Sequence, residues 1–384
     1  MIARFRLSLL FILCFGLTPA QPVQTYQGTP SLREYTYGVS INPLAPSINE
    51  ALLLAAELDP DWLLVAFDWQ LWYPTRDAIP EWQPLDETLH FAKQQNLGVC
   101  LRISNAPAWA LTNSGPDHQA TLALLHTLLE RYAGSILAVE IFPGANTSQG
   151  WGAPPSAGAY QALTQSIAHF LQQSGSNLTL VAGGLVFADD FNPAEQINGL
   201  EFLQGLYDAG IKNTAAILSL QLVNLSDDPF QHANNENQPV LRHIDAVRQI
   251  MLQNDHEQGL VWITTLSIQP GDSNGQIGNL TTACSLLRSR LFVGAVVPAA
   301  VNTLPPSFPS PAVLQAGAEN QSLFTELYDL ITRNRLQNHS PAASRQKETT
   351  GLSKETYVHD QPNPFQYLLA RFSDLSCTWF GHCQ

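Results

Sequence analysis

Short apolar runs alternate along the chain with segments in which apolar residues recur at helical spacing. The alternation begins at Tyr35 and continues to about Leu336. Strands that alternate with helices indicate βα units and a parallel sheet. Eight apolar runs predict eight strands, at Tyr37–Ile41, Trp62–Phe67, Val99–Ile103, Ala138–Phe142, Leu178–Ala182, Ile217–Val223, Leu260–Thr264 and Phe292–Val297.

The segments between these runs predict eight helices. Several start at Ser, Asp or Pro, the residues that cap a helix or fit its first turn. The expected starts are near Ser47, Pro84, Asp117, Pro155, Gly199, Pro239, Ile277 and Pro311. Eight βα units over roughly 300 residues predict a (β/α)8 barrel. A doubly wound sheet is the alternative, but the first strand is not followed by a GxGxxG sequence.

The rest of the chain divides by composition. Residues 1–20 read as a signal peptide, and residues 21–34 as a polar leader before the barrel, which spans 35–336. Residues 337–364 are rich in Gln, Asn, Ser, Thr and Lys and predict a surface linker. Residues 365–384 are apolar again and predict a C-terminal tail that packs on the barrel.

The N-terminal residues predict export to a secreted or extracytoplasmic location. Arg4 and Arg6 precede the apolar stretch Leu7–Leu17, and Thr18-Pro19-Ala20 offers small residues for cleavage before Gln21. The apolar stretch is shorter than the ~20 residues of a membrane span. An uncleaved anchor is the alternative, and the sequence contains no other membrane-spanning candidate.

The net charge and the cysteine content limit the kinds of ligand and cofactor that are expected for the protein. The net charge of −14 argues against nucleic acid, which requires a basic face. The spacing of Cys and His suggests no metal site, and no cofactor is expected. Cys100 and Cys284 fall in strand and helix patterns and are expected to be buried. Cys377 and Cys383 are compatible with a disulfide in an exported protein.

The stretch Leu137–Asn146, LAVEIFPGAN, is the most informative part of the chain. It reads as a short buried strand that ends in a turn at Pro143-Gly144. It resembles the fourth strand of (β/α)8 glycoside hydrolases of the large retaining clan (the cellulase, β-xylosidase and β-mannanase type), which ends in a phrase like E-I-W-N-E-P-N. The phrases PAWA, WGAPPS and VWIT elsewhere in the chain support the same resemblance.

The resemblance implies two catalytic glutamates, at the ends of the fourth and seventh strands. These positions are occupied by Gly144 and Thr265. The second strand carries no Arg at the family's position, and Gln221 and Val223 stand where the family has His and Tyr. Glycine has no proton to donate, and a threonine hydroxyl is a poor nucleophile without an adjacent base. The standard double displacement is therefore expected to be lost.

Other polar and aromatic residues fall at the predicted strand ends. Glu140 lies too deep to replace the lost acid and is expected to be buried and paired. The aromatic rings can either stack on a sugar or plug the barrel mouth. The candidates for substrate binding are Asn105, Trp109, Trp151, Trp69, Asp68 and Gln221.

Two functions remain open. The first is a non-catalytic barrel that binds a polysaccharide or another glycan, or serves as a scaffold. The second is an active glycoside hydrolase with a relocated carboxylate pair, in which Asp68 works with Asp228 or Asp272. Six N-x-S/T sequons also occur, at Asn146, Asn177, Asn224, Asn279, Asn320 and Asn338.

Overall fold

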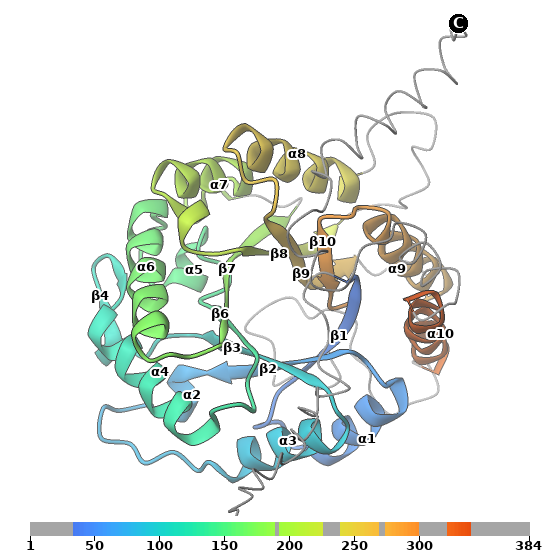
Figure 1. The fold of residues 1–384 in the computed structure, drawn as a ribbon, viewed down its shortest axis with the longest axis horizontal. Helices are drawn as coiled ribbons and strands as arrows, with labels where there is room; N and C mark the ends of the chain where they lie inside the picture. The colour runs from blue at the N-terminus through green and yellow to red at the C-terminus, as the bar shows by residue number, and fades with distance from the viewer. Residues whose placement is uncertain (1–33, 189–191, 226–238, 269–272, 299–320, 339–384) are drawn as a thin grey trace, which may run out of the picture.

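The computed structural model describes residues 34–188, 192–225, 239–268, 273–298 and 321–338. Eight parallel strands close into a barrel in the order β1-β10-β9-β8-β7-β6-β3-β2. This arrangement, viewed along the barrel in Figure 1, confirms the predicted (β/α)8 barrel. The strands are β1 Thr36–Ile41, β2 Trp62–Asp68, β3 Gly98–Ser104, β6 Ala138–Ile141, β7 Thr179–Ala188, β8 Ile217–Leu225, β9 Leu260–Ile268 and β10 Val293–Val296.

A ring of helices surrounds the strands (Figure 1). Asp117 and Ser156 accept hydrogen bonds from backbone N–H groups in the first turns of α4 and α6, as their N-cap positions predict. Helices α1 and α10 are in contact, so the first and last units close the ring. The helices that cover the barrel are α1 Ile48–Leu58, α3 Gln83–Gln94, α4 His118–Tyr132, α6 Ala157–Gln173, α7 Gly199–Asp208, α8 Pro239–Gln253, α9 Ser273–Arg288 and α10 Gln321–Asn338.

Shorter elements form part of the loops at the carboxyl ends of the strands. Helix α2, Trp69–Trp72, follows β2 directly, and α5, Ser148–Trp151, lies in the loop after β6. The 3-10 turn Ala108–Ala110 and the two-stranded hairpin of β4, Leu111–Thr112, and β5, Gly115–Pro116, follow β3. A second 3-10 turn, Ile211–Asn213, lies instead at the amino end of a strand, between α7 and β8.

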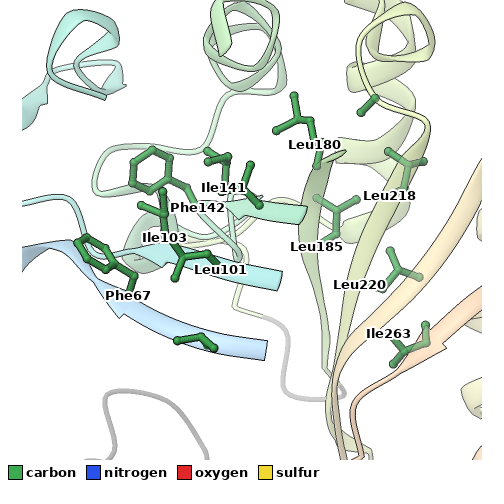
Figure 2. Close-up of a cluster of buried hydrophobic side chains, with 14 of the residues drawn as sticks. Phe67, Leu101, Ile103, Ile141, Phe142, Leu180, Leu185, Leu218, Leu220 and Ile263 are labelled. Atoms are coloured by element: carbon green, nitrogen blue, oxygen red, sulfur yellow. The ribbon is translucent and has the colours of Figure 1, made fainter. Parts of the chain in front are cut away.

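Side-chain alternation along the strands produces two apolar layers. One cluster fills the barrel interior, the lumen, and includes Trp62, Leu64, Cys100, Ala138 and Trp262. The other lies between the strands and the helices. Figure 2 shows part of this outer cluster, with residues from β2, β3, β7, β8 and β9 and the end of β6: Phe67, Leu101, Ile103, Ile141, Phe142, Leu180, Leu185, Leu218, Leu220 and Ile263.

Two of the register shifts in the barrel sheet interrupt this alternation where the interior becomes polar. In β7 the register shifts between Ala182 and Leu185, and the intervening Gly183 and Gly184 have φ of 108° and 53°. In β9 the pairing passes from Ile263 to Thr265 while β8 advances only from Leu220 to Gln221. Thr264 is therefore the extra residue, and both Thr264 and Thr265 direct their hydroxyls into the lumen, where they meet Glu140 and Arg102.

Several expectations concern parts of the chain outside the described residues. These are the signal, the leader apart from Glu34, the tail and its Cys377–Cys383 pair, Asp228 and Asp272, and the expected helix start near Pro311. The predicted linker lies there too, apart from its first two residues, which end α10. Among the described helices none is long and apolar enough to cross a membrane. Cys100 and Cys284 are described, and both are buried as expected, with burial raising the pKa of each thiol.

Candidate functional site

An ion pair joins two neighbouring strands on the lumen side of the barrel, near their carboxyl ends. Arg102 on β3 donates from Nε to Glu140 Oε2 on β6 at 2.6 Å. The Glu140 side chain is fully buried, whereas 15% of the Arg102 side chain is exposed. Because the lost solvation of a buried carboxylate is offset only by close partners, this pairing explains how Glu140 is tolerated. It confirms the expectation of a buried, paired glutamate.

The same arginine reaches the opposite wall of the barrel. Its Nη2 donates to the carbonyl oxygen of Thr264 at 2.8 Å, and its Nη1 to the hydroxyl of Thr265 at 3.2 Å. Thr264 in turn donates its hydroxyl to Glu140 Oε1 at 2.7 Å. Arg102, Glu140, Thr264 and Thr265 therefore form one network, called here the lumen network.

Gln221 on β8 extends this network toward β7. Its amide donates to the carbonyl oxygen of Gly184 at 2.9 Å, and its Oε1 lies 3.4 Å from the Thr265 hydroxyl. Gln221 is buried. The structure thus brings two of the sequence candidates, Gln221 and Thr265, into contact below the mouth of the barrel.

Gly144 follows the fourth barrel strand in a left-handed backbone conformation. It has φ of 83°, and its N–H donates to the Gly184 carbonyl at 2.6 Å. A Cβ atom at this position would lie 3.4 Å from Gly150 Cα and 3.5 Å from Thr147 Oγ1. Asn146 holds the loop onto β7 through hydrogen bonds with the backbone N–H and carbonyl of Val186. The turn after β6 is therefore a closed, backbone-packed structure.

Asp68 and Asn105 lie together at the ends of β2 and β3. Asn105 Nδ2 donates to Asp68 Oδ2 at 2.6 Å, and the other carboxylate oxygen of Asp68 accepts the Leu71 N–H as the N-cap of α2. Asn105 has φ of 51°, a left-handed conformation that Asn adopts more readily than most residues. Burial raises the pKa of Asp68, while the Asn105 hydrogen bond opposes that rise.

Trp109 follows in the same loop after β3 and is partly exposed. Its indole N–H donates to the Tyr73 carbonyl at 2.9 Å, and the Trp69 ring meets it edge-on with centroids 5.5 Å apart. The guanidinium of Arg76 lies over the ring at 5.5 Å from its centroid. Three of the sequence candidates, Asp68, Asn105 and Trp109, are therefore partly exposed at the ends of β2 and β3.

Trp69 and Trp151 are held inside the protein. Each is 1% exposed, and both belong to the outer core cluster with Phe142. Trp151 packs edge-on against Tyr160 and donates its indole N–H to the Ser114 carbonyl at 2.8 Å. Phe142 has φ of 44° and packs against both tryptophans. Neither tryptophan presents a ring face to solvent in this structure.

Exposure of the lumen-facing residues differs around the mouth. On β1, β2 and β3 the last inward-facing residues are partly exposed, namely Ser40, Ala66, Asp68, Arg102 and Ser104. These five residues are called the mouth patch. On β6, β8 and β9 the corresponding residues Glu140, Gln221 and Thr265 are buried. The mouth is therefore more exposed on the side of the first three strands than at β6, β8 and β9.

The described residues contain no group of three or more His, Cys, Asp and Glu side chains that could hold a metal ion. The polar functions at the mouth are instead one arginine, paired carboxylates, amides and hydroxyls. Such a set can hydrogen-bond hydroxyl groups of a ligand in both directions.

The comparisons with known proteins fit this geometry at the level of fold. No family model and no curated protein matches the chain. A GH5_18 structure from Bifidobacterium longum subsp. longum, in complex with Manβ1-4GlcNAc, matches with a TM-score of 0.58 and 12% identity, over 79% of this chain and 79% of that one. An endo-β-1,4-glucanase from Xanthomonas axonopodis pv. citri matches with a TM-score of 0.54 and 11% identity, over 78% and 99% of the two chains.

A GH39 enzyme from Xanthomonas axonopodis pv. citri matches with a TM-score of 0.53 and 16% identity, over 70% of this chain. The chain spans only 59% of the length of that enzyme. These neighbours are glycoside hydrolases of clan A with a parallel eight-stranded barrel. The protein therefore has a glycoside-hydrolase-like (β/α)8 fold. At these low sequence identities, the similarity shows the fold alone.

Sequence reasoning did not identify Arg102. It sought a lumen arginine on the second barrel strand, and the structure supplies one from the third. The available signal was a pair of charged residues, Arg102 and Glu140, each at an alternate position of an otherwise apolar strand. Two opposite charges in neighbouring buried strands predict an ion pair, because neither is tolerated in the core alone.

Proposed function

We propose that the protein is an exported, non-hydrolytic barrel that binds a glycan at the carboxyl-terminal mouth. The proposal depends on the presence of glycine at position 144. Its position in the family phrase belongs to the acid/base glutamate, and its positive φ suits a residue without a side chain. Without a proton donor there, leaving-group departure loses a contribution of about 10²- to 10⁴-fold.

The lumen network supports the same conclusion at the other catalytic position. The Thr265 hydroxyl donates to the Thr264 carbonyl at 2.9 Å and accepts from Arg102, so no base activates it. Glu140 has both carboxylate oxygens occupied, by Arg102 and Thr264. A retaining glycosidase needs two carboxyl groups about 5 Å apart, one free to attack. No described lumen residue supplies that free group.

Glycan binding is supported by the partly exposed residues at the ends of β2 and β3. Trp109 offers a partly exposed aromatic residue, and Asp68 and Asn105 offer a carboxylate and an amide at the ends of the same two strands. A binding site for a sugar combines apolar surface with a few fixed polar groups. Buried Trp69 and Trp151 are assigned to supporting the strand-end loops, with Trp69 directly behind Trp109.

A combined binding and hydrolysis assay tests this proposal. Wild-type protein is expected to bind at least one neutral oligosaccharide in isothermal titration calorimetry and to release no aryl aglycone from the matching glycoside. Trp109→Ala is expected to weaken binding about tenfold, the equivalent of 1.4 kcal/mol. Tyr328→Ala, which removes a half-exposed ring from α10, is the control and should bind as wild type. Turnover, or no binding to any sugar, contradicts the proposal.

Export rests on the N-terminal residues alone. Arg4, Arg6 and the apolar stretch Leu7–Leu17 favour a signal peptide cleaved before Gln21. Fractionation of an expressing cell, followed by N-terminal sequencing, tests it. A protein that stays in the cytoplasm with residues 1–20 intact would overturn this part of the proposal.

A hydrolytic function for Asp68 is the second candidate, and the raised pKa of its carboxyl favours it. A general acid needs a pKa near the working pH, which burial promotes. Its carboxylate, however, is engaged with Asn105 and the Leu71 N–H. Hydrolysis of an aryl glycoside that disappears in Asp68→Asn would favour this candidate over the non-hydrolytic one.

A further inference from the structure

Arg102 has hydrogen-bond donors beyond those the lumen network uses. A guanidinium carries five N–H groups, and the network takes one at Nε, one at Nη1 and one at Nη2. One N–H on each terminal nitrogen is thus unpaired among the described residues. The Arg102 side chain is 15% exposed and belongs to the mouth patch, so part of it is open to solvent.

The network also fixes the orientation of the guanidinium. Its three bonds go to β6 and to two residues of β9, so the plane is anchored on two sides of the barrel. An arginine fork held in this way is organised before a ligand arrives, and little further entropy is lost on binding. The two N–H groups that the network does not use can donate to acceptor oxygens of a ligand.

The charges around Arg102 determine whether its unused N–H groups favour carboxylate or hydroxyl oxygens. The positive charge of Arg102 is paired at 2.6 Å with Glu140, and the other members of the network, Thr264 and Thr265, are neutral. The whole chain carries a net charge of −14. A carboxylate ligand would meet the paired Glu140 and a negative protein, whereas a pair of hydroxyls meets neither penalty.

We propose that Arg102 is the floor of a subsite for adjacent hydroxyl groups of a neutral sugar, and that the site disfavours hexuronates. The neighbouring mouth-patch residues Ser40, Ser104 and Asp68 supply further partners for hydroxyls. Asp68 accepts and the serines donate or accept, so both hydrogen-bond roles of a sugar hydroxyl are served. This subsite rests on the proposed glycan-binding function and specifies the chemical class of the ligand.

Calorimetric titration of the full chain with defined oligosaccharides tests the subsite. The neutral probes are cellopentaose, mannopentaose, xylopentaose and laminaripentaose, and the acidic probe is pentagalacturonate. Two variants remove the fork in different ways. Arg102→Lys keeps a charge opposite Glu140 but lacks a planar pair of donors. Arg102→Gln/Glu140→Gln removes both charges together, which leaves no uncompensated charge in the lumen.

Both variants are expected to bind the preferred neutral probe roughly 10- to 100-fold more weakly than wild type. The control is Arg290→Gln/Asp245→Asn, which removes an ion pair near the amino end of β10, away from the mouth. It should bind as wild type. Thermal unfolding of each variant establishes that it is folded at the titration temperature.

The outcomes separate this inference from the function on which it rests. Unchanged binding of neutral sugar by both Arg102 variants overturns the subsite and leaves glycan binding standing. Tighter binding of pentagalacturonate than of every neutral probe overturns it as well. Failure of wild-type protein to bind any of the probes removes the proposed function and the subsite together.

Discussion

Arg102 and Thr264 face each other from opposite walls of the barrel. Arg102 is on β3 and Thr264 is on β9, four strands away in either direction around the closed sheet. Their contact, Nη2 to carbonyl oxygen, is 2.8 Å. The carbonyl is available because the bulge in β9 breaks the regular pairing at Thr264. The lumen is therefore bridged by polar atoms directly above its apolar layer.

Removal of Arg102 alone is predicted to destabilise the protein strongly. Arg102→Met leaves Glu140 buried without its charge partner, and loss of one partner of a buried pair costs about 3–5 kcal/mol. Urea unfolding followed by tryptophan fluorescence measures this loss. Arg102→Met/Glu140→Leu should cost much less, since it removes both charges. A single variant as stable as the double one would show that the pair contributes little.

Two glycines that both lie in helices are predicted to have opposite effects on stability when each is replaced by alanine. Gly150 in α5 would place a Cβ atom 2.5 Å from the Gly144 carbonyl oxygen, whereas Gly158 in α6 has nothing within 4 Å. Gly150→Ala should destabilise by about 1–3 kcal/mol because backbone atoms must move. Gly158→Ala should be neutral or stabilising by up to about 1 kcal/mol. Thermal unfolding compares them, and equal effects would contradict the packing at Gly144.

Stability is predicted to fall at mildly acidic pH because of His256. The ring is buried, and its Nδ1 lies 2.9 Å from the Tyr207 hydroxyl. Burial, aided by the charges of Lys212 and Arg248, lowers the pKa of His256. The unfolded chain then binds a proton more readily, so this stability is complete above about pH 6.5 and declines as pH falls.

The measurement for His256 is the free energy of unfolding between pH 7.5 and pH 5. His256→Gln should have a shallower slope over this range than wild type, because it removes the titrating ring. His90→Gln serves as control, since His90 is exposed on α3. A wild-type slope retained in His256→Gln would assign the pH dependence to other groups.

The sequons are predicted to differ in their response to a glycosylating host. Asn146 is 1% exposed, and its amide donates to the carbonyls of Val186 and Ile197 at 3.0 Å. Asn177 is exposed in the turn before β7. Secretion from a yeast or insect cell should therefore give a glycan on Asn177 and none on Asn146, as read by peptide mass spectrometry. Occupancy of Asn146 would contradict its burial.

Some of the site could be predicted from local pattern. Asp68 and Asn105 each follow an apolar strand, and parallel strands present their carboxyl ends at one edge, so their proximity follows from the fold. Glu140 was predictable as buried and paired because its strand is otherwise apolar. The burial of the aromatic rings at the strand ends could not be predicted in this way. An aromatic residue after a strand can contact a ligand or pack in the core equally well. Trp109 remained partly exposed, and Trp151 was covered.

The sequence by itself determined the eight-unit barrel and the residues at its strand ends, including Gly144 and Thr265, since hydrophobic periodicity is a local property. Only the tertiary structure decided that Arg102 bridges to β9, and that a bulge turns Thr264 as well as Thr265 into the lumen. These contacts join residues more than 120 positions apart. Closure of the sheet brings them together, and no local pattern encodes which opposing side chains then meet.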